Sequence, residues 1–251
     1  MLNFSFRSHR GCKREKNEDR FFVPPENGPS LFAVADGMGG HTAGEVASSI
    51  SITTVQEKFA NSFQNMTQFE TPLITELLEK TVLQANENII MAQERDSLLQ
   101  GMGTTLTVLF LLERELLVAH VGDSQAHIFS QNSHIQVTED HSLAMELLRN
   151  GQISPEELHK HPQRNYLTRA LGTTSELSVD TFSVVLQDGD YILLCTDGLT
   201  SMLRPSAIQQ IINRSISLEE ISDELIQTAN SVGGDDNITF ILIKYTGNSD
   251  S

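Results

Sequence analysis

The sequence predicts an α/β sandwich, with antiparallel β-sheets in the middle and pairs of α-helices outside. Strand-like runs follow one another through short turns between residues 104 and 137, which favours antiparallel meanders over βαβ crossovers. Helical segments come in consecutive pairs and do not alternate with each strand. No repeat, low-complexity segment or linker interrupts the chain, so residues 1–251 are expected to form a single domain, with the last few residues as a disordered tail.

The strands are predicted from apolar runs of strand length, and the helices from longer stretches with an apolar stripe. The expected strands are Leu31–Ala35, Thr104–Leu112, Glu115–Val121, Ala126–Phe129, Leu177–Val185, Tyr191–Cys195 and Ile238–Lys244. The expected helices span about 42–59, 72–92, 205–213 and 218–231. In the second helix Thr71 is expected to be the cap, and Pro72 suits the first turn.

Residues 142–165 are predicted to form two short helices, separated by Gly151 and Pro155. They stand between strands as an insertion. Insertions of this length often cover or flank a functional site. We therefore expect a small helical flap beside such a site.

Composition excludes several classes of protein. A formal net charge of −16 disfavours nucleic-acid binding, because phosphate backbones repel such a surface. The longest apolar stretch, 106–112, is too short to cross a bilayer, and the N-terminal residues lack the apolar core of a signal peptide. Cys12 and Cys195 lie far apart, and Cys195 stands in an apolar run, which favours unpaired thiols. A cytoplasmic protein without membrane contact is therefore expected.

Aspartates recur beside the predicted strands. The motifs are KNED at 16–19, ADGMGGHTAGE at 35–45, TDG at 196–198 and GGDDNIT at 233–239. An Asp at a strand end projects from the edge of a sheet, where distant parts of a chain can converge. Asp235 and Asp236 would point to opposite sides of an extended chain, so only one can face a common site. Carboxylates without a Cys/His pattern favour Mg²⁺ or Mn²⁺ over zinc.

Such a cluster needs cations for its own stability. Two carboxylates 4 Å apart repel each other by roughly 4 kcal/mol at an effective dielectric constant of 20, and divalent ions reverse that cost. Asp36 could bridge two ions, and Gly37 has no side chain to keep its carbonyl from a cation. Arg14 could grip two phosphate oxygens through its planar guanidinium. For Asp36 and Gly37 the alternative is a glycine-rich turn that binds no ligand. For Arg14 the alternative is a solvated side chain in a basic run.

Taken together, the motifs resemble those of the metal-dependent Ser/Thr protein phosphatases of type 2C, the PPM family, and specifically their short bacterial members. The resemblance covers nearly the whole chain in order. It rests on GCKREKNED, VADGMGGHTAGEVAS, GMGTTL, HVGDS, DHSL, HPQRNYLTRALG, CTDGL and GGDDNITF. It implies two central antiparallel β-sheets flanked by pairs of antiparallel helices, and hydrolysis of phosphoserine and phosphothreonine on proteins.

The resemblance also implies roles for individual residues. Two Mn²⁺ or Mg²⁺ ions would be held by Asp36, the carbonyl of Gly37, Asp197 and Asp236. Asp123 matches a ligand of a weaker third ion. Asp19 would act through bound water, and Arg14 would hold the phosphate. The expected partners are phosphorylated proteins, including a bacterial Ser/Thr kinase and its substrates, and the chain is expected to be a monomer.

Two positions depart from the family pattern. Gln125 stands where the family's Gly-Asp-Ser-Arg has its arginine, and Met38 stands where animal members have a histidine. The Gln125 departure bears on local stability and on the third ion. Two other functions stay open at this point: a binding module that keeps the fold without turnover, and a phosphatase of small phosphoesters.

Overall fold

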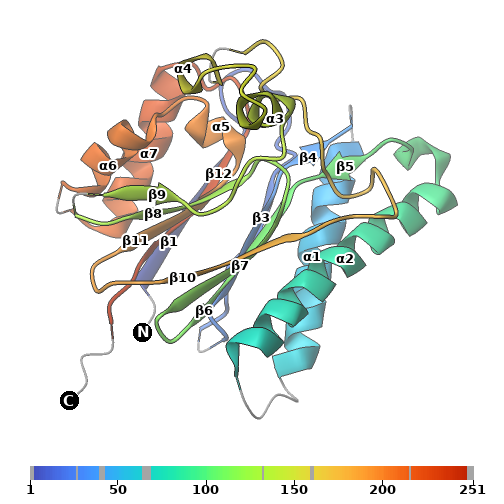
Figure 1. The fold of residues 1–251 in the computed structure, drawn as a ribbon, viewed down its shortest axis with the longest axis horizontal. Helices are drawn as coiled ribbons and strands as arrows, with labels where there is room; N and C mark the ends of the chain where they lie inside the picture. The colour runs from blue at the N-terminus through green and yellow to red at the C-terminus, as the bar shows by residue number, and fades with distance from the viewer. Residues whose placement is uncertain are drawn as a thin grey trace.

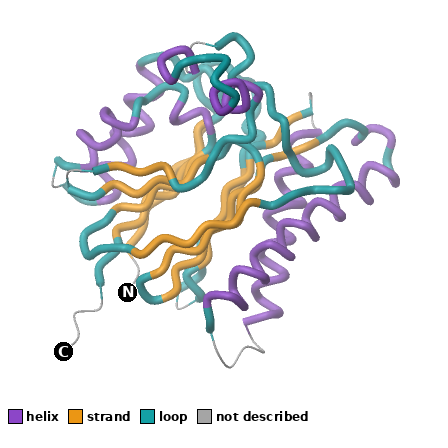
Figure 2. Tube along the Cα trace, viewed as in Figure 1, coloured by secondary structure: helices purple, strands orange, loops and turns teal. Residues whose placement is uncertain are grey.

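Two antiparallel sheets of five strands each pack against one another at the centre of the computed structural model (Figures 1 and 2). The structure describes residues 3–26, 28–39, 43–63, 69–131, 133–158, 161–214 and 216–247. One sheet has, in spatial order, β1 (Asn3–His9), β12 (Ile238–Lys244), β11 (Tyr191–Cys195), β8 (Gln125–Phe129) and β9 (His134–Gln136). The other has β10 (Asp180–Val185), β7 (Glu115–Val121), β6 (Leu106–Leu112), β3 (Leu31–Ala35) and β2 (Arg20–Phe22). A short ribbon joins β4 (Gly37–Met38) to β5 (Gly103–Thr104).

Helix pairs cover the two outer faces. Helices α1 (Ala43–Phe63) and α2 (Thr71–Arg95) lie on the β10–β2 sheet, and η1 (Ser97–Leu99) follows them. Helices α6 (Pro205–Ile212) and α7 (Leu218–Ser231) lie on the β1–β9 sheet, and α5 (Asp197–Thr200) directly follows β11. The flap contains α3 (Leu143–Arg149) and α4 (Pro155–Leu158). The predicted architecture of two sheets between helix pairs is therefore confirmed.

Each interface between layers has its own apolar core. Alternate residues of the strands face the other sheet, as Phe32, Val34, Ile192 and Leu194 do. The intervening residues face the helices: Leu31 and Ala33 pack under α1 and α2, and strand residues of the other sheet pack under α6 and α7. Strands buried on both faces read as nearly continuous apolar runs, which is why these strands were visible in the sequence.

Several predicted boundaries need correction. Thr71 does not cap α2: the N-cap residue is Glu70, and the Thr71 hydroxyl bonds to the carboxylate of Glu115 on β7. The run 104–112 is divided between β5 and β6, and only Asp180–Val185 of the run 177–185 is strand. Helix α1 continues to Phe63, beyond the predicted end at 59. The predicted tail includes 248–251, which lie outside the described residues.

The sequence prediction missed strands β1, β2, β4 and β9. Strand β1 lies at a sheet edge and pairs with β12 over its whole length, from Asn3 opposite Lys244 to His9 opposite Ile238. Its polar residues alternate with Phe4 and Phe6, a period of two that the basic residues obscured. None of the helices in the described part of the chain is both long enough and apolar enough to cross a membrane.

Candidate active site

The ends of β3 and β11 and the start of β12 bring three of the predicted aspartates together at one end of the sandwich (Figure 1). Asp36 follows β3, and Asp197 follows β11 as the first residue of α5. Asp236 precedes β12, which runs antiparallel to β11 with Phe240 opposite Cys195. Because neighbouring antiparallel strands begin and end at the same edge, the motifs at 197 and 236 must meet.

Two glycines let backbone segments touch at this edge. A Cβ on Gly37 would stand 2.2 Å from the carbonyl oxygen of Gly44 in the first turn of α1. A Cβ on Gly198 would stand 1.9 Å from the carbonyl oxygen of Asn237. No side chain fits at such distances, and backbone cannot yield as a flexible side chain can. The glycines after Asp36 and Asp197 therefore allow close packing around both aspartates.

Asn237 ties the N-terminal loop to the start of β12. Its amide nitrogen donates to the carbonyls of Arg10, at 3.0 Å, and Lys16, at 2.8 Å. Its amide oxygen accepts from the backbone N–H of Glu18 at 2.8 Å. These bonds hold the loop that carries Arg14 and Asp19 against the segment that carries Asp236. The motif GGDDNIT contained this asparagine, but its role depends on contacts more than 200 residues apart in sequence.

Two threonines hold the backbone of Asp36. The N–H of Asp36 donates to the Thr105 hydroxyl at 2.9 Å, and its carbonyl accepts from the Thr104 hydroxyl at 2.8 Å. The backbone N–H of Thr105 donates to the same carbonyl at 2.9 Å. The motif GMGTTL therefore positions Asp36, a role that residue type alone did not indicate.

The carboxylates differ in burial but share one electrostatic field. Asp19 and Asp123 are buried, with 2% and 8% of their surface exposed, while Asp36, Asp197 and Asp236 are partly open. Burial raises the pKa of Asp36 well above its usual range, and Asp19 and Asp197 raise it further. Burial, then Asp236, raises the pKa of Asp197 to about 6. The pKa values rise because buried like charges converge, and Arg14 and Arg164 offset this effect at Asp197 only in part.

Asp19 has one oxygen that finds no partner among the described residues. The Thr196 hydroxyl donates to Asp19 Oδ2 at 3.0 Å, while the buried Oδ1 is left without a hydrogen bond. Burial raises the pKa of Asp19 to about 7, although hydrogen bonding by Thr239 and Thr196 lowers it. A buried carboxylate oxygen of this kind is costly unless it has a partner.

Arg14 lies at the rim of this acidic site. Its Nη2 donates to Asp236 Oδ2 at 2.8 Å, and its side chain is 55% exposed. Burial lowers the pKa of Arg14, but Asp236, Asp36 and Glu18 raise it by more, which shows that the guanidinium faces the carboxylates. The neighbouring Asp235 pairs instead with Lys13 at 2.7 Å. Only one aspartate of the adjacent pair faces the site, as the sequence predicted.

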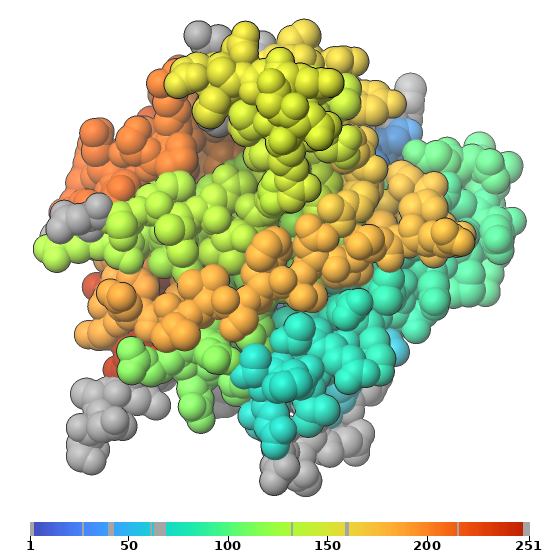
Figure 3. Space-filling model, in the orientation of Figure 1, coloured from blue at the N-terminus to red at the C-terminus, as the bar shows by residue number. Residues whose placement is uncertain are grey.

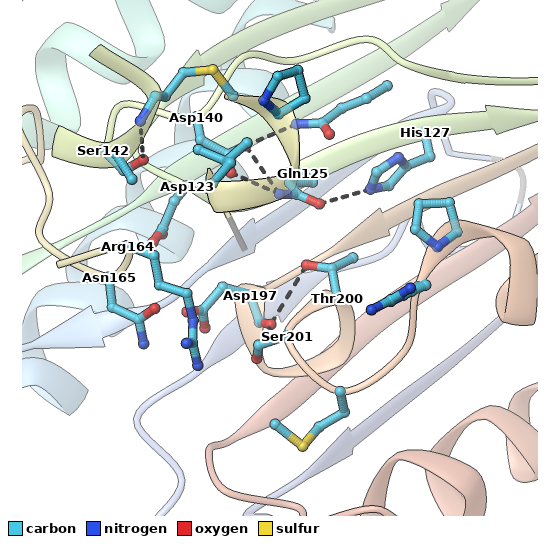
Figure 4. A pocket seen from close by; sticks show the side chains of 18 of the residues that line it. Asp123, Gln125, His127, Asp140, Ser142, Arg164, Asn165, Asp197, Thr200 and Ser201 are labelled. Carbon is cyan, nitrogen blue, oxygen red and sulfur yellow. Dashed lines mark hydrogen bonds between the residues drawn. The ribbon is translucent and has the colours of Figure 1, made fainter. Parts of the chain in front are cut away.

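Asp123 lies just before strand β8 and near Asp197, whose charge raises the pKa of Asp123. Gln125 pairs with Cys195 in the β8–β11 ladder, and continuing this register places position 123 opposite position 197. Both aspartates line a groove of about 800 Å³ between the flap and the start of α6. In the close view, the side chain of Arg164 lies beside Asp197 (Figure 4). In the space-filling view, the flap, drawn yellow, covers this end of the molecule (Figure 3).

The structure gives Gln125 a partner that the sequence left open. The Gln125 amide nitrogen donates to both oxygens of Asp140, at 3.0 and 2.9 Å. Asp140 stands just before the flap and lines the same groove. Burial raises its pKa to about 6, although the amides of Gln125 and Gln136 lower it.

The donor set suits a hard divalent cation. It consists of aspartate oxygens, including the unpartnered Oδ1 of Asp19. Among the residues that the structure describes, no three carboxylate, imidazole or thiol side chains come together closely enough to enclose an ion unaided. Mg²⁺ and similar ions keep several water ligands and need few protein carboxylates, so these residues fit a partly hydrated ion.

An acidic site with Arg14 at its rim and Arg164 beside Asp197 is typical of proteins that bind divalent cations together with phosphate groups. The model of the family described as Protein phosphatase 2C matches residues 7–242. The chain belongs to this family.

Bacterial relatives agree over nearly full length. The chain is 40% identical to serine/threonine phosphatase stp of Listeria monocytogenes, covering 97% of this chain and 96% of that protein. It is 37% identical to protein phosphatase PhpP of Streptococcus pneumoniae, covering 96% and 97%. The structure of Stp1 from Staphylococcus aureus superposes with a TM-score of 0.91 at 33% identity, covering 98% and 96%. The catalytic domain of the phosphatase PstP, in complex with two manganese ions, gives 0.84 at 31% identity, covering 98% of each chain.

Proposed function

We propose that this chain is a metal-dependent protein-serine/threonine phosphatase, a hydrolase of phosphoserine and phosphothreonine on proteins. The observation that carries the proposal is the convergence of Asp19, Asp36, Asp197 and Asp236 at one edge, with Arg14 at its rim. Membership of the phosphatase family and the manganese ions of PstP support it.

We assign the cation ligands to Asp36, the carbonyl of Gly37, Asp197 and Asp236, with Asp123 for a weaker third ion. The ions would be Mn²⁺ or Mg²⁺, two in number, with the third bound more weakly. The raised pKa values of Asp36 and Asp123 support this assignment, because a cation supplies the positive charge that these carboxylates lack. Asp19 would hold an ion through bound water, which gives its unpartnered Oδ1 a role.

When bound, divalent cations neutralise a phosphate group and lower the pKa of water to near neutrality. The residues of the chain position the phosphate group and the carboxylates around it. Arg14 can bind two phosphate oxygens through its planar guanidinium, and Asp236 keeps it at the rim. Threonines 104 and 105 hold Asp36 rigidly through its backbone, so its carboxylate needs little rearrangement. The flap borders the groove through which a phosphorylated segment would reach Asp197.

The cellular setting is part of the same proposal. Phosphorylated proteins are the substrates, among them a Ser/Thr protein kinase and that kinase's targets. The protein acts as a monomer in the cytoplasm, where its two free cysteines would remain reduced. The match over residues 7–242 supports a single phosphatase domain.

Hydrolysis of a phosphothreonine peptide tests this function. The chain should release phosphate with Mn²⁺ and lose that activity with a chelator. Asp36→Asn should reduce turnover by at least about a hundredfold, because it removes a charged ligand beside the reacting group. Asp188→Asn, which changes an exposed carboxylate in the β10–β11 turn, is the matched control and should keep full activity. Activity that survives removal of the metal would disprove the proposal.

The two other functions give different results. A binding module would release no phosphate, and its affinity for a partner would survive Asp36→Asn. A phosphatase of small phosphoesters would hydrolyse free phosphoserine as fast as a phosphopeptide. The open groove between flap and α6 favours a polypeptide substrate, because it extends well beyond a single phosphoamino acid.

A further inference from the structure

A row of polar side chains leads away from Asp123 along one face of β8. Gln125 and His127 share this face because side chains alternate along a strand, and Asp123 lies just before the strand begins. The face is the one that Cys195 and Phe129 present to α6 and α7. At one end of the row, beyond the paired ends of β8 and β11, Asp123 lies near Asp197. Figure 4 shows Gln125 between Asp140 and His127.

The orientation of the Gln125 amide follows from its partners. Its nitrogen contacts both oxygens of Asp140, and a carboxylate can only accept, so the amide oxygen must face His127. The His127 Nε2, 2.9 Å from that oxygen, must then carry the proton. Its Nδ1 in turn accepts from His134 Nε2 at 2.9 Å. Each hydrogen bond in the series from His134 through His127 and Gln125 is therefore donated in the direction of Asp140.

None of the groups in this series places a positive charge beside Asp140. Gln136 donates to Asp140 Oδ1 at 2.8 Å, so both side chains that bond this carboxylate are neutral amides. Burial and the neighbouring His134 lower the pKa of His127 to about 3, which keeps its ring neutral. Within the described residues, Asp140 forms no ion pair with Lys, Arg or His.

The charge of Asp140 interacts electrostatically with the carboxylates of the candidate cation site. Asp140 raises the pKa of Asp123, and Asp197 raises that of Asp140. The three carboxylates line the same groove. Coulombic attraction between a divalent ion and an added carboxylate extends several ångströms in a partly buried site, so Asp140 need not touch the ion to hold it.

We propose that Asp140 strengthens divalent-cation binding on the Asp123–Asp197 side of the site, and that Gln125 makes this possible by holding the carboxylate without cancelling its charge. This inference rests on the proposed function, because it concerns the affinity of that same site. An arginine at position 125, as in the family motif, would hold Asp140 equally well but neutralise it. The glutamine therefore tunes this chain toward tighter binding of its weakest ion.

Mn²⁺ binding measured by titration calorimetry at pH 7.5 tests this role on the full chain. Gln125→Arg adds one positive charge to the groove, and Asp140→Asn removes one negative charge. Each variant should therefore weaken the weakest Mn²⁺ site about tenfold. Gln125→Met keeps the charge of the groove and removes the Gln125 hydrogen bonds, while Gln136 still donates to Asp140 and keeps the carboxylate in place. It should change the affinity less than about twofold while lowering the unfolding temperature. Glu79→Gln, on the exposed face of α2, removes the same charge far from the groove and should change nothing.

The outcomes separate the two proposals. Equal Mn²⁺ affinity in the wild type and in Gln125→Arg would overturn the role of Gln125. So would an equal loss in Gln125→Met, because the hydrogen bonds and not the charge would then matter. Far-ultraviolet circular dichroism in a chelator checks that each variant folds. If Gln125→Arg does not fold, the Mn²⁺ affinity of Asp140→Asn alone tests whether the charge of Asp140 strengthens binding, and an affinity equal to that of the wild type would overturn the inference. A wild-type chain that binds no Mn²⁺ would refute the proposed function as well.

Discussion

Replacing Asp19 by Asn should make the metal-free protein more stable while weakening its response to metal. Asp19 is 2% exposed, and burial is the main cause that raises its pKa from an ordinary value of 3.8 to about 7. Because the folded-state pKa is the higher one, the folded protein loses stability as the pH rises from 3.8 through about 7. Above pH 7 the charged carboxylate costs the metal-free fold about 4 kcal/mol.

The asparagine removes that cost but adds a smaller one. Its carbonyl can still accept from the Thr196 hydroxyl, while its amide takes the place of the unpartnered Oδ1. An unsatisfied buried donor costs about 1–3 kcal/mol. The net gain at pH 8 is therefore about 2 kcal/mol. At pH 5 the wild-type cost is under about 2 kcal/mol, so the gain should vanish.

Urea unfolding in the presence of a chelator, at pH 8 and at pH 5, measures both values. A second series with Mn²⁺ should show a large stabilisation of the wild type and a small one of Asp19→Asn, since ligand binding stabilises the state that binds it. Asp188→Asn serves as the control in each series. A variant that is less stable than the wild type at pH 8 without metal would refute the reasoning about Asp19.

Three further predictions concern single positions. Arg14→Lys should raise the KM for a phosphothreonine peptide about tenfold, since an ammonium lacks the bidentate geometry of a guanidinium. Lys13→Ala is the control, and it should leave the KM unchanged. Equal KM values for the wild type and Arg14→Lys would contradict the role of Arg14. Gly37→Ala should destabilise the protein by more than about 3 kcal/mol in urea unfolding, because its Cβ would meet backbone at 2.2 Å, whereas Gly247→Ala meets no atom closer than 3.6 Å. His127→Gln should reduce acid lability. The pKa of this histidine falls from 6.5 to about 3 on folding, so the wild type loses about 3 kcal/mol more than the variant between pH 7 and pH 4. If the unfolding free energies of the wild type and His127→Gln changed in parallel with pH, burial of a neutral His127 would not explain the acid lability.

Local pattern was sufficient for most of the fold. Strands β3, β6, β7, β11 and β12 are buried on both faces, so their apolar runs were unmistakable. Helix α7 occupies Leu218–Ser231 as predicted, because Ser217 and Glu220 form a capping box at its start. The edge strands β1, β2 and β9 were missed, since an edge needs neither a long apolar run nor full burial, whereas the edge strand β10 was predicted within the run 177–185.

The sequence by itself determined which residues could bind cations and phosphate. Aspartates beside strand ends, with glycines after Asp36 and Asp197, restrict both the chemistry and the place where the motifs can meet. Only the tertiary structure decided how that site is held together. The amide of Asn237 and the hydroxyls of Thr104 and Thr105 act on partners far away in sequence, and the carboxylate of Asp140 accepts from Gln125 on β8. Such contacts depend on strand register and loop packing, which no local pattern encodes.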